Sequence, residues 1–183
     1  MSTRPGCLHH VELWVPDLPR AIAEWGWLLT SLGYEQFQDW EAGRSWNLDG
    51  TYLVVEQSPA MTAPGHDRLR PGLNHLAFHA GPREQVDKLT AEAPEHGWTL
   101  LFPDRHPHAG GPDHYAAYLT NTDAYEVELV ATTPEESPSG RTPRSPARGP
   151  GQAGAPSPSG PAYPPATPTT SPPAPPSPMQ LSE

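Results

Sequence analysis

The feature that most constrains the fold is a strand-like run that occurs twice, each time with a histidine near its start. The first copy is residues 8–15 and the second is residues 72–79, and their histidines, His10 and His75, lie 65 positions apart. Gly33 and Gly97 recur at nearly the same spacing. Recurrence of a pattern at a fixed period indicates a duplicated structural unit.

Both units have the same predicted order of elements. In the first, apolar residues recur at helical spacing between Asp17, a predicted N-cap, and Gly33, a predicted stop. Strand-like runs follow at 34–40, 45–48 and 51–57; in the second unit a helix after residue 82 precedes runs at 98–102, 115–120 and 126–131. We therefore predict an α+β fold: two βαβββ modules, about residues 7–57 and 72–131, forming a curved mixed sheet around a cleft.

Composition divides the chain near residue 132. Residues 132–183 hold 16 of the 27 prolines and almost no large apolar residues. Such a segment cannot bury enough apolar surface to offset the entropy lost on ordering. We predict a folded domain over residues 1–131 and a disordered Pro/Ser/Gly-rich tail over 132–183. Its PxxP spacing leaves three roles open: an inert tail, a spacer, or a ligand for a proline-reading partner.

The charge distribution narrows the classes of partner. The tail carries equal numbers of acidic and basic residues, so the formal net charge of -10 belongs to residues 1–131. This charge disfavours nucleic acid and anionic membranes as partners. Cys7 is the single cysteine, so an intrachain disulfide is impossible and a metal site would use nitrogen and oxygen ligands. The chain has neither a signal-peptide pattern nor a long apolar run, which predicts a cytoplasmic protein.

A histidine on the first strand and a glutamate on the last strand of each unit form the candidate metal site. These residues are His10 and Glu56 in the first unit, and His75 and Glu128 in the second. Any one of them alone is more often solvated or hydrogen-bonded than metal-bound. Their coincidence at corresponding places predicts that they converge around a divalent ion (Zn, Ni, Co, Mn or Fe), with one or two positions left for water or substrate.

Three segments, residues 9–18, 72–78 and 114–130, resemble the vicinal oxygen chelate superfamily. This superfamily includes glyoxalase I, fosfomycin resistance proteins, extradiol dioxygenases and bleomycin resistance proteins. The resemblance implies paired βαβββ modules and, in metal-dependent members, ligands at the four positions named above. The complete His-Glu-His-Glu set is similar to that of glyoxalase I, because the fosfomycin and dioxygenase branches typically use three protein ligands.

The resemblance implies a divalent-metal-dependent, glyoxalase-like lyase or isomerase. Its small substrate would chelate the ion through vicinal oxygens, and Glu128 or Glu56 would move a proton between adjacent carbons. Two alternatives stay open: a metal-free protein that binds a small molecule or an antibiotic, as bleomycin resistance proteins do, and an Fe(II) extradiol dioxygenase. Relatives also imply a homodimer. Trp14 stands where glutathione-using relatives resemble one another in a basic residue, so glutathione is not the expected thiol.

Several other residues are weaker candidates. Residues predicted to share the strand faces of the histidines, as substrate contacts or as structural residues, are Glu12, Trp14, Tyr52 and His79. The loop histidines His106, His108 and His114 are open to a lid, to a second metal site, and to a solvated loop, which their spacing favours. Arg68 and Arg70 are open to holding a substrate carboxylate or to lying in a solvated loop.

Overall fold

A computed structural model describes residues 5–62 and 65–132 of the chain. The Pro-rich segment that we predict to be disordered lies outside the described residues, apart from Thr132. Within the described residues, no helix is both long enough and apolar enough to cross a membrane.

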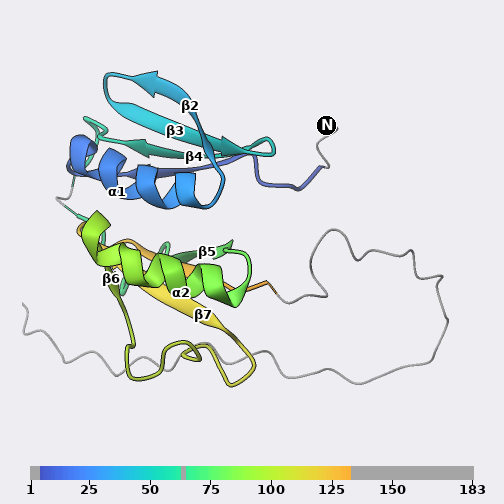
Figure 1. Ribbon diagram of the computed structural model, residues 1–183. Helices are drawn as coiled ribbons and strands as arrows, with labels where there is room; N and C mark the ends of the chain where they lie inside the picture. The colour runs from blue at the N-terminus through green and yellow to red at the C-terminus, as the bar shows by residue number, and fades with distance from the viewer. Residues whose placement is uncertain (1–4, 63–64, 133–183) are drawn as a thin grey trace, which may run out of the picture.

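The two predicted βαβββ modules are confirmed (Figure 1). The first contains β1 (His10–Trp14), α1 (Leu18–Ser31), β2 (Glu35–Trp40), β3 (Gly43–Leu48) and β4 (Thr51–Glu56). The second contains β5 (His75–His79), α2 (Arg83–Glu92), the 3-10 helix η1 (Ala93–His96), β6 (Trp98–Leu100), β7 (Ala116–Asn121) and β8 (Glu126–Val130). The sheets have the orders β1-β4-β3-β2 and β5-β8-β7-β6. In each sheet the first strand pairs in parallel with the last, and the other pairs are antiparallel.

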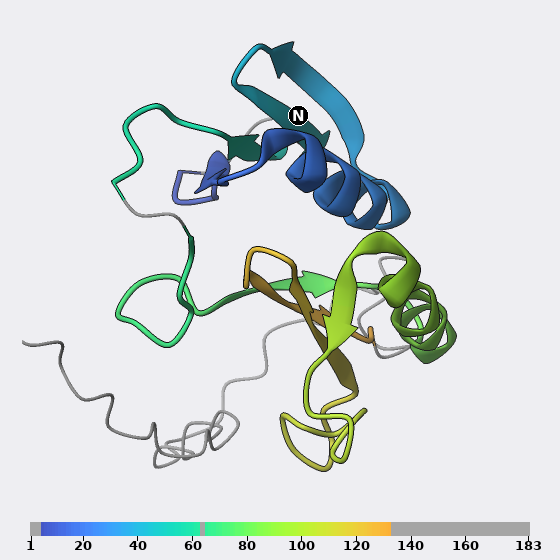
Figure 2. The ribbon, with the colours of Figure 1, turned by 90° about the vertical axis from the view of Figure 1, so that its left-hand side faces the viewer.

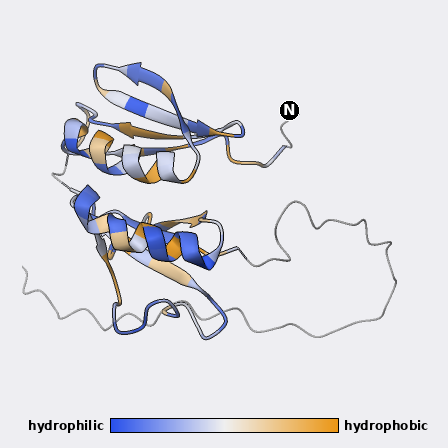
Figure 3. Cartoon of the chain, viewed as in Figure 1, coloured by the Kyte–Doolittle hydropathy of each residue, from blue (hydrophilic) through white to orange (hydrophobic). Residues whose placement is uncertain are grey.

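Local sequence signals explain why α1 forms where it does. The Asp17 side chain accepts a hydrogen bond from the Arg20 backbone N–H at 3.1 Å, and Pro19 lies in the first turn. Both features stabilise a helix N-terminus. Gly33 follows the helix with a φ of 88°, a left-handed conformation that glycine adopts at low cost. Figure 3 shows apolar and polar residues alternating around α1 and α2, so each helix has one face suited to packing on its sheet.

One hydrophobic core joins the two modules, because α1 packs against the second module as well as against its own sheet. The rings of Trp25 and Trp98 meet edge to face, with centroids 5.1 Å apart. The Trp98 indole N–H donates to the Glu24 carbonyl at 3.1 Å, and the Asn121 amide donates to the Glu24 carboxylate at 2.9 Å. Figure 2 shows α1 lying between its own sheet and the second module. Buried contacts therefore hold the two modules together.

The inner face of each sheet, meaning the face opposite its helix, carries the polar strand residues. Val11 and Leu13 of β1 belong to the core, so strand alternation puts His10, Glu12 and Trp14 on the inner face. This face of the first sheet is exposed: Trp14, Phe37 and Trp40 are 42%, 55% and 36% accessible. Large exposed aromatic residues gathered on one face are typical of a binding surface.

The inner face of the second sheet is partly covered by residues 101–115, the long connection between β6 and β7 (yellow-green at the bottom of Figure 1). Ala109 of this loop packs with Ala116 and Tyr118 in a small cluster of their own, and Phe102 lies against it. The sequence predicts an enlarged loop here, and the structure places it on the sheet face that carries His75 and Glu128.

Candidate functional site

Glu128 is the centre of the candidate site. It lies on the inner face of β8 and is 7% accessible. Its Oε1 accepts hydrogen bonds from the Tyr118 hydroxyl at 2.6 Å and from His114 Nε2 at 2.5 Å. Tyr118 is the β7 residue directly opposite Glu128 in the ladder, whereas His114 comes from the loop. The buried carboxylate is therefore satisfied at one oxygen, while its Oε2 faces His75 Nε2 at 3.3 Å.

The geometry of His75 and Glu128 suits two ligands of one divalent ion. Metal bonds to imidazole nitrogen and carboxylate oxygen are about 2.1 Å long. Ligand atoms 3.3 Å apart then subtend roughly 100° at the ion, close to tetrahedral or octahedral values. His114 Nε2 lies only 2.5 Å from Glu128 Oε1, and two ligands of one ion are roughly 3 Å apart or more. His114 thus hydrogen-bonds to the carboxylate rather than sharing an ion with it.

A second carboxylate, Glu126, lies beside this pair. It is opposite His75 in the ladder, and its side chain has no accessible surface. Arg68, from the segment between the modules, forms an ion pair with it at 2.6 Å. Burial raises the pKa of Glu126 above its ordinary value, Arg68 and His75 lower it, and Glu128 raises it. The net effect is a raised pKa, so ionisation of Glu126 depends on the arginine.

In the first module, His10 and Glu56 are arranged differently. His10 is opposite Tyr52 and Glu56 lies four residues farther along β4, whereas Glu128 lies only two residues beyond the partner of His75. Four residues of strand span about 13 Å, so His10 and Glu56 are poorly placed to share an ion. The counterpart of Glu128 in the first module is Val54. The prediction of corresponding positions is right for the two histidines and wrong for the two glutamates.

The structure therefore brings together two of the four predicted ligands. His10 stacks on Tyr52, with ring centroids 4.9 Å apart, and its Nδ1 lies 2.9 Å from that of His9. Over residues 5–62 and 65–132, no three side chains among His, Cys, Asp and Glu are arranged to hold a metal ion. The His75–Glu128 pair fits a divalent ion, and within one chain it is not joined by His10 or Glu56.

Two predicted loop residues belong to the site. The spacing of the loop histidines favours a solvated loop, yet His114 binds Glu128. Arg68, for which the sequence leaves a substrate contact and a solvated loop open, is paired with buried Glu126. Arg70 is exposed and pairs with Asp67. In the sequence, the feature that could have assigned His114 to the site is its position just before β7, close to Tyr118.

The weaker candidates lie in two places. Glu12 accepts a hydrogen bond from the Trp14 indole at 2.7 Å, on the exposed inner face of the first sheet beside Tyr52. His79 lines a pocket of about 560 Å³ that also contains His114. Thr132 lines the same pocket, and its backbone N–H donates to the Gly81 carbonyl at 2.7 Å. His114 therefore lines this pocket and also hydrogen-bonds to Glu128.

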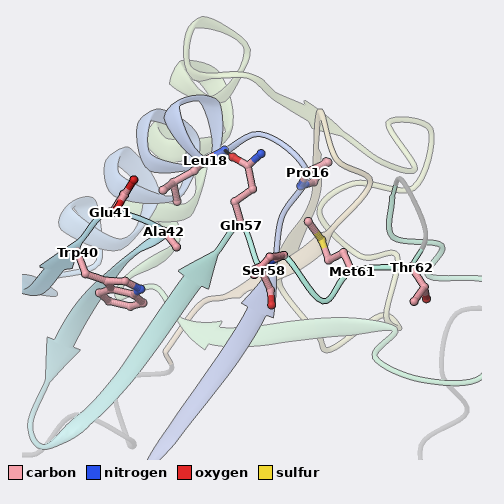
Figure 4. Close-up of a pocket in the computed structure, with 10 residues that line it drawn as sticks. Pro16, Leu18, Trp40, Glu41, Ala42, Gln57, Ser58, Met61 and Thr62 are labelled. Atoms are coloured by element: carbon pink, nitrogen blue, oxygen red, sulfur yellow. Dashed lines mark hydrogen bonds between the residues drawn. The ribbon is translucent and has the colours of Figure 1, made fainter.

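A larger pocket of about 1030 Å³ lies in the first module, beside the residues that follow β1 and β4 (Figure 4). Its lining includes Leu18, Trp40, Gln57 and Met61. The Gln57 side chain accepts a hydrogen bond from the Leu18 backbone N–H at 3.1 Å, so it supports the start of α1. Because none of the predicted ligands lines this larger pocket, the candidate chemistry lies at Glu128 despite the larger volume here.

Comparison with known proteins gives one family. A family model described as the glyoxalase/bleomycin resistance protein/dioxygenase superfamily matches residues 9–118. The uncharacterised YqjT protein of Bacillus subtilis is 46% identical over 125 residues, which are 68% of this chain and 98% of YqjT.

Solved structures agree with this family. A glyoxalase candidate from Bacillus halodurans is 49% identical with a TM-score of 0.67, and the match covers 70% of this chain and 97% of that one. The fosfomycin resistance protein FosX from Listeria monocytogenes, solved with Mn(II) and sulfate, is 20% identical with a TM-score of 0.51, covering 73% of this chain and 95% of that one. The likeness to FosX concerns the fold alone.

Proposed function

The chain belongs to the glyoxalase/bleomycin resistance protein/dioxygenase superfamily, and from this premise we propose that it is a metal-dependent enzyme. Its substrate would be a small molecule that chelates a divalent ion through two neighbouring oxygens. The observation that carries the proposal is the His75–Glu128 pair, whose 3.3 Å separation on a mostly buried sheet face suits two ligands of one ion.

A third ligand is needed, and His10 is the best candidate. It lies on the exposed inner face of the first sheet, away from His75 and Glu128, so a second copy of the chain would supply it. Trp14, Phe37 and Trp40 give this face the exposed aromatic surface that a dimer interface buries. The proposed site is therefore shared across a homodimer.

When bound, the ion would act as a Lewis acid on the substrate oxygens, and no organic cofactor is needed. Tyr118 and His114 hold Glu128 in place through its Oε1, which leaves Oε2 directed at the site. Glu56, which is poorly placed as a ligand beside His10, is a candidate for moving a proton on the substrate.

Metal analysis of the purified protein tests this proposal. We expect close to one ion of Zn, Ni, Co, Mn or Fe per chain; Mn belongs in the test because FosX was solved with it. Glu128→Gln and His75→Ala should lose the ion, whereas Glu95→Gln, at an exposed position, should keep it. A wild-type protein without any of these ions near stoichiometry would contradict the proposal. A screen of thiol adducts that are α-hydroxycarbonyls, and of vicinal diols, would then identify the substrate.

The extradiol dioxygenase alternative gains support from the position of Glu56. Without Glu56, the candidate ligands are His10, His75 and Glu128, and two histidines with one carboxylate are typical of non-haem Fe(II) oxygenases. Oxygen consumption by the iron-loaded protein in the presence of a catechol separates this activity from a lyase or isomerase. Binding without turnover, as in bleomycin resistance proteins, is the remaining alternative, favoured by the exposed Trp14, Phe37 and Trp40.

A further inference from the structure

We propose that Asn74 and Arg68 are positioning residues, which fix the His75 ring so that the lone pair of Nε2 points at Glu128. The inference deepens the proposed function and rests on His75 and Glu128 being metal ligands. It concerns which ring nitrogen of His75 carries the proton, and hence which one is free to bind an ion.

The orientation of the Asn74 amide follows from two of its contacts. Its Nδ2 lies 3.0 Å from the Arg68 backbone carbonyl, which can only accept, so this atom must be the amide nitrogen. The Asn74 Oδ1 then faces His75 Nδ1 at 2.8 Å. An amide oxygen can only accept, so His75 Nδ1 must carry a hydrogen.

The consequence for the other ring nitrogen is direct. In neutral imidazole one nitrogen carries the hydrogen and the other has a lone pair, so the lone pair of His75 belongs to Nε2. That nitrogen lies 3.3 Å from Glu128 Oε2. Two lone-pair donors face each other at this distance, and a bound cation between them relieves the repulsion. Asn74 thus prepares the pair for a metal ion before the ion arrives.

Arg68 is held in place by the buried carboxylate of Glu126, beside the site. Its guanidinium pairs at 2.6 Å with Glu126, whose side chain is completely buried, and the arginine side chain is itself only 18% accessible. Breaking a buried ion pair is costly, so this contact fixes the connecting segment against β8. The Arg68 carbonyl is then in position to orient Asn74. Contacts run from Glu126 through Arg68 and Asn74 to His75.

Two measurements on the full-length protein test the proposal. The first is the ¹⁵N NMR spectrum of the metal-free protein, in which the two ring nitrogens of a histidine are distinguished by whether they carry a hydrogen. We expect wild-type His75 to carry its hydrogen on Nδ1, and Asn74→Ala to shift the population toward Nε2–H. The second is titration with Zn²⁺ alone, in which Asn74→Ala should weaken affinity by about 10- to 100-fold, the usual effect of removing a partner of a ligating histidine.

Conservative and control variants separate positioning from folding. Asn74→Asp keeps an oxygen that accepts from His75 Nδ1 but loses the hydrogen bond to the Arg68 carbonyl. It should therefore keep the Nδ1–H form and bind Zn²⁺ more tightly than Asn74→Ala does. Arg68→Ala should weaken Zn²⁺ binding, whereas Arg70→Ala, at an exposed residue near it in sequence, should not. Circular dichroism spectra check that each variant is folded.

The proposal is overturned by Asn74→Ala protein that is folded, keeps the Nδ1–H form and binds Zn²⁺ as wild type does. If Glu128→Gln abolishes Zn²⁺ binding in the same experiment, the proposed metal site survives and only the role of Asn74 fails. If wild-type protein binds no Zn²⁺, the ¹⁵N spectra of wild type and Asn74→Ala still decide whether Asn74 sets the His75 tautomer.

Discussion

Replacing Arg68 with alanine should destabilise the protein in a way that depends on pH. In the wild type the Glu126 side chain has no accessible surface, and the substitution removes the arginine that pairs with its carboxylate. Burial already raises the pKa of Glu126 above its ordinary value, and Arg68 is the larger of the two groups that lower it. In the variant we expect Glu126 to be protonated when the protein is folded and ionised when it is unfolded.

The magnitude follows from that difference in protonation. An unfolded glutamate ionises near pH 4.3, and each pH unit above this value costs about 1.4 kcal/mol if the folded state keeps the proton. Arg68→Ala should therefore lower the free energy of unfolding by up to about 3.8 kcal/mol at pH 7 and up to about 1 kcal/mol at pH 5. These values are upper limits because the pKa of Glu126 is already raised in the wild type. The value at pH 7 agrees with the usual cost of removing one partner of a buried ion pair, about 3–5 kcal/mol.

Urea denaturation at pH 5, 6 and 7 measures this effect. The sign is fixed by linkage: a carboxyl whose folded pKa is raised contributes stability at low pH and loses it as pH rises through that pKa. Adding Glu126→Gln to Arg68→Ala should remove the pH dependence, because glutamine does not ionise. A loss of stability below about 1 kcal/mol at pH 7, or one that is equal at pH 5 and pH 7, would refute the reasoning.

Three further changes test other parts of the structure. Burial raises the pKa of Glu24, so the stability of Glu24→Gln relative to wild type should improve as pH rises above about 4.5 in urea denaturation; no change with pH would count against a buried carboxylate there. Gly110→Ala would place a Cβ 2.5 Å from the His114 ring, and we expect a loss of about 1–3 kcal/mol with weaker metal binding by calorimetry; unchanged binding would show that the loop need not pack so closely. An equal mixture of His10→Ala and Glu128→Gln proteins should recover about one quarter of wild-type metal binding if sites are shared between copies in a dimer, and no recovery would place each site within one chain.

The elements of the fold could be predicted because their signals are local. The pattern around α1 depends on residues a few positions apart, from Asp17 to Gly33, and the structure has a helix there. The repeat itself, read from His10 and His75, supplied the topology. Both signals can be recognised in the sequence without knowing which strands pair.

The candidate site was only partly predictable, because it depends on register and on loops. Glu56 and Glu128 both lie in the last strand-like run of their modules, but pairing shows that they differ by two residues relative to their histidines. The order of the strands gives no information about such a two-residue shift. The shift keeps the glutamate on the same face of the sheet and changes only its distance from the histidine. Contacts of His114 and Arg68 depend on how long connections fold back onto the second sheet, and no local pattern specifies this.

The position of Thr132 has a practical consequence for experiments on this protein. Its hydrogen bond to Gly81 anchors the chain just after β8 at the rim of the pocket that contains His79 and His114. Any purification tag, fluorophore or immobilisation linker attached through the C-terminal segment is tethered to that rim. Even a group that binds weakly then reaches a high local concentration at the pocket. A histidine tag placed there would compete for the same ions as the candidate site, so assays of metal content call for an N-terminal or cleavable tag.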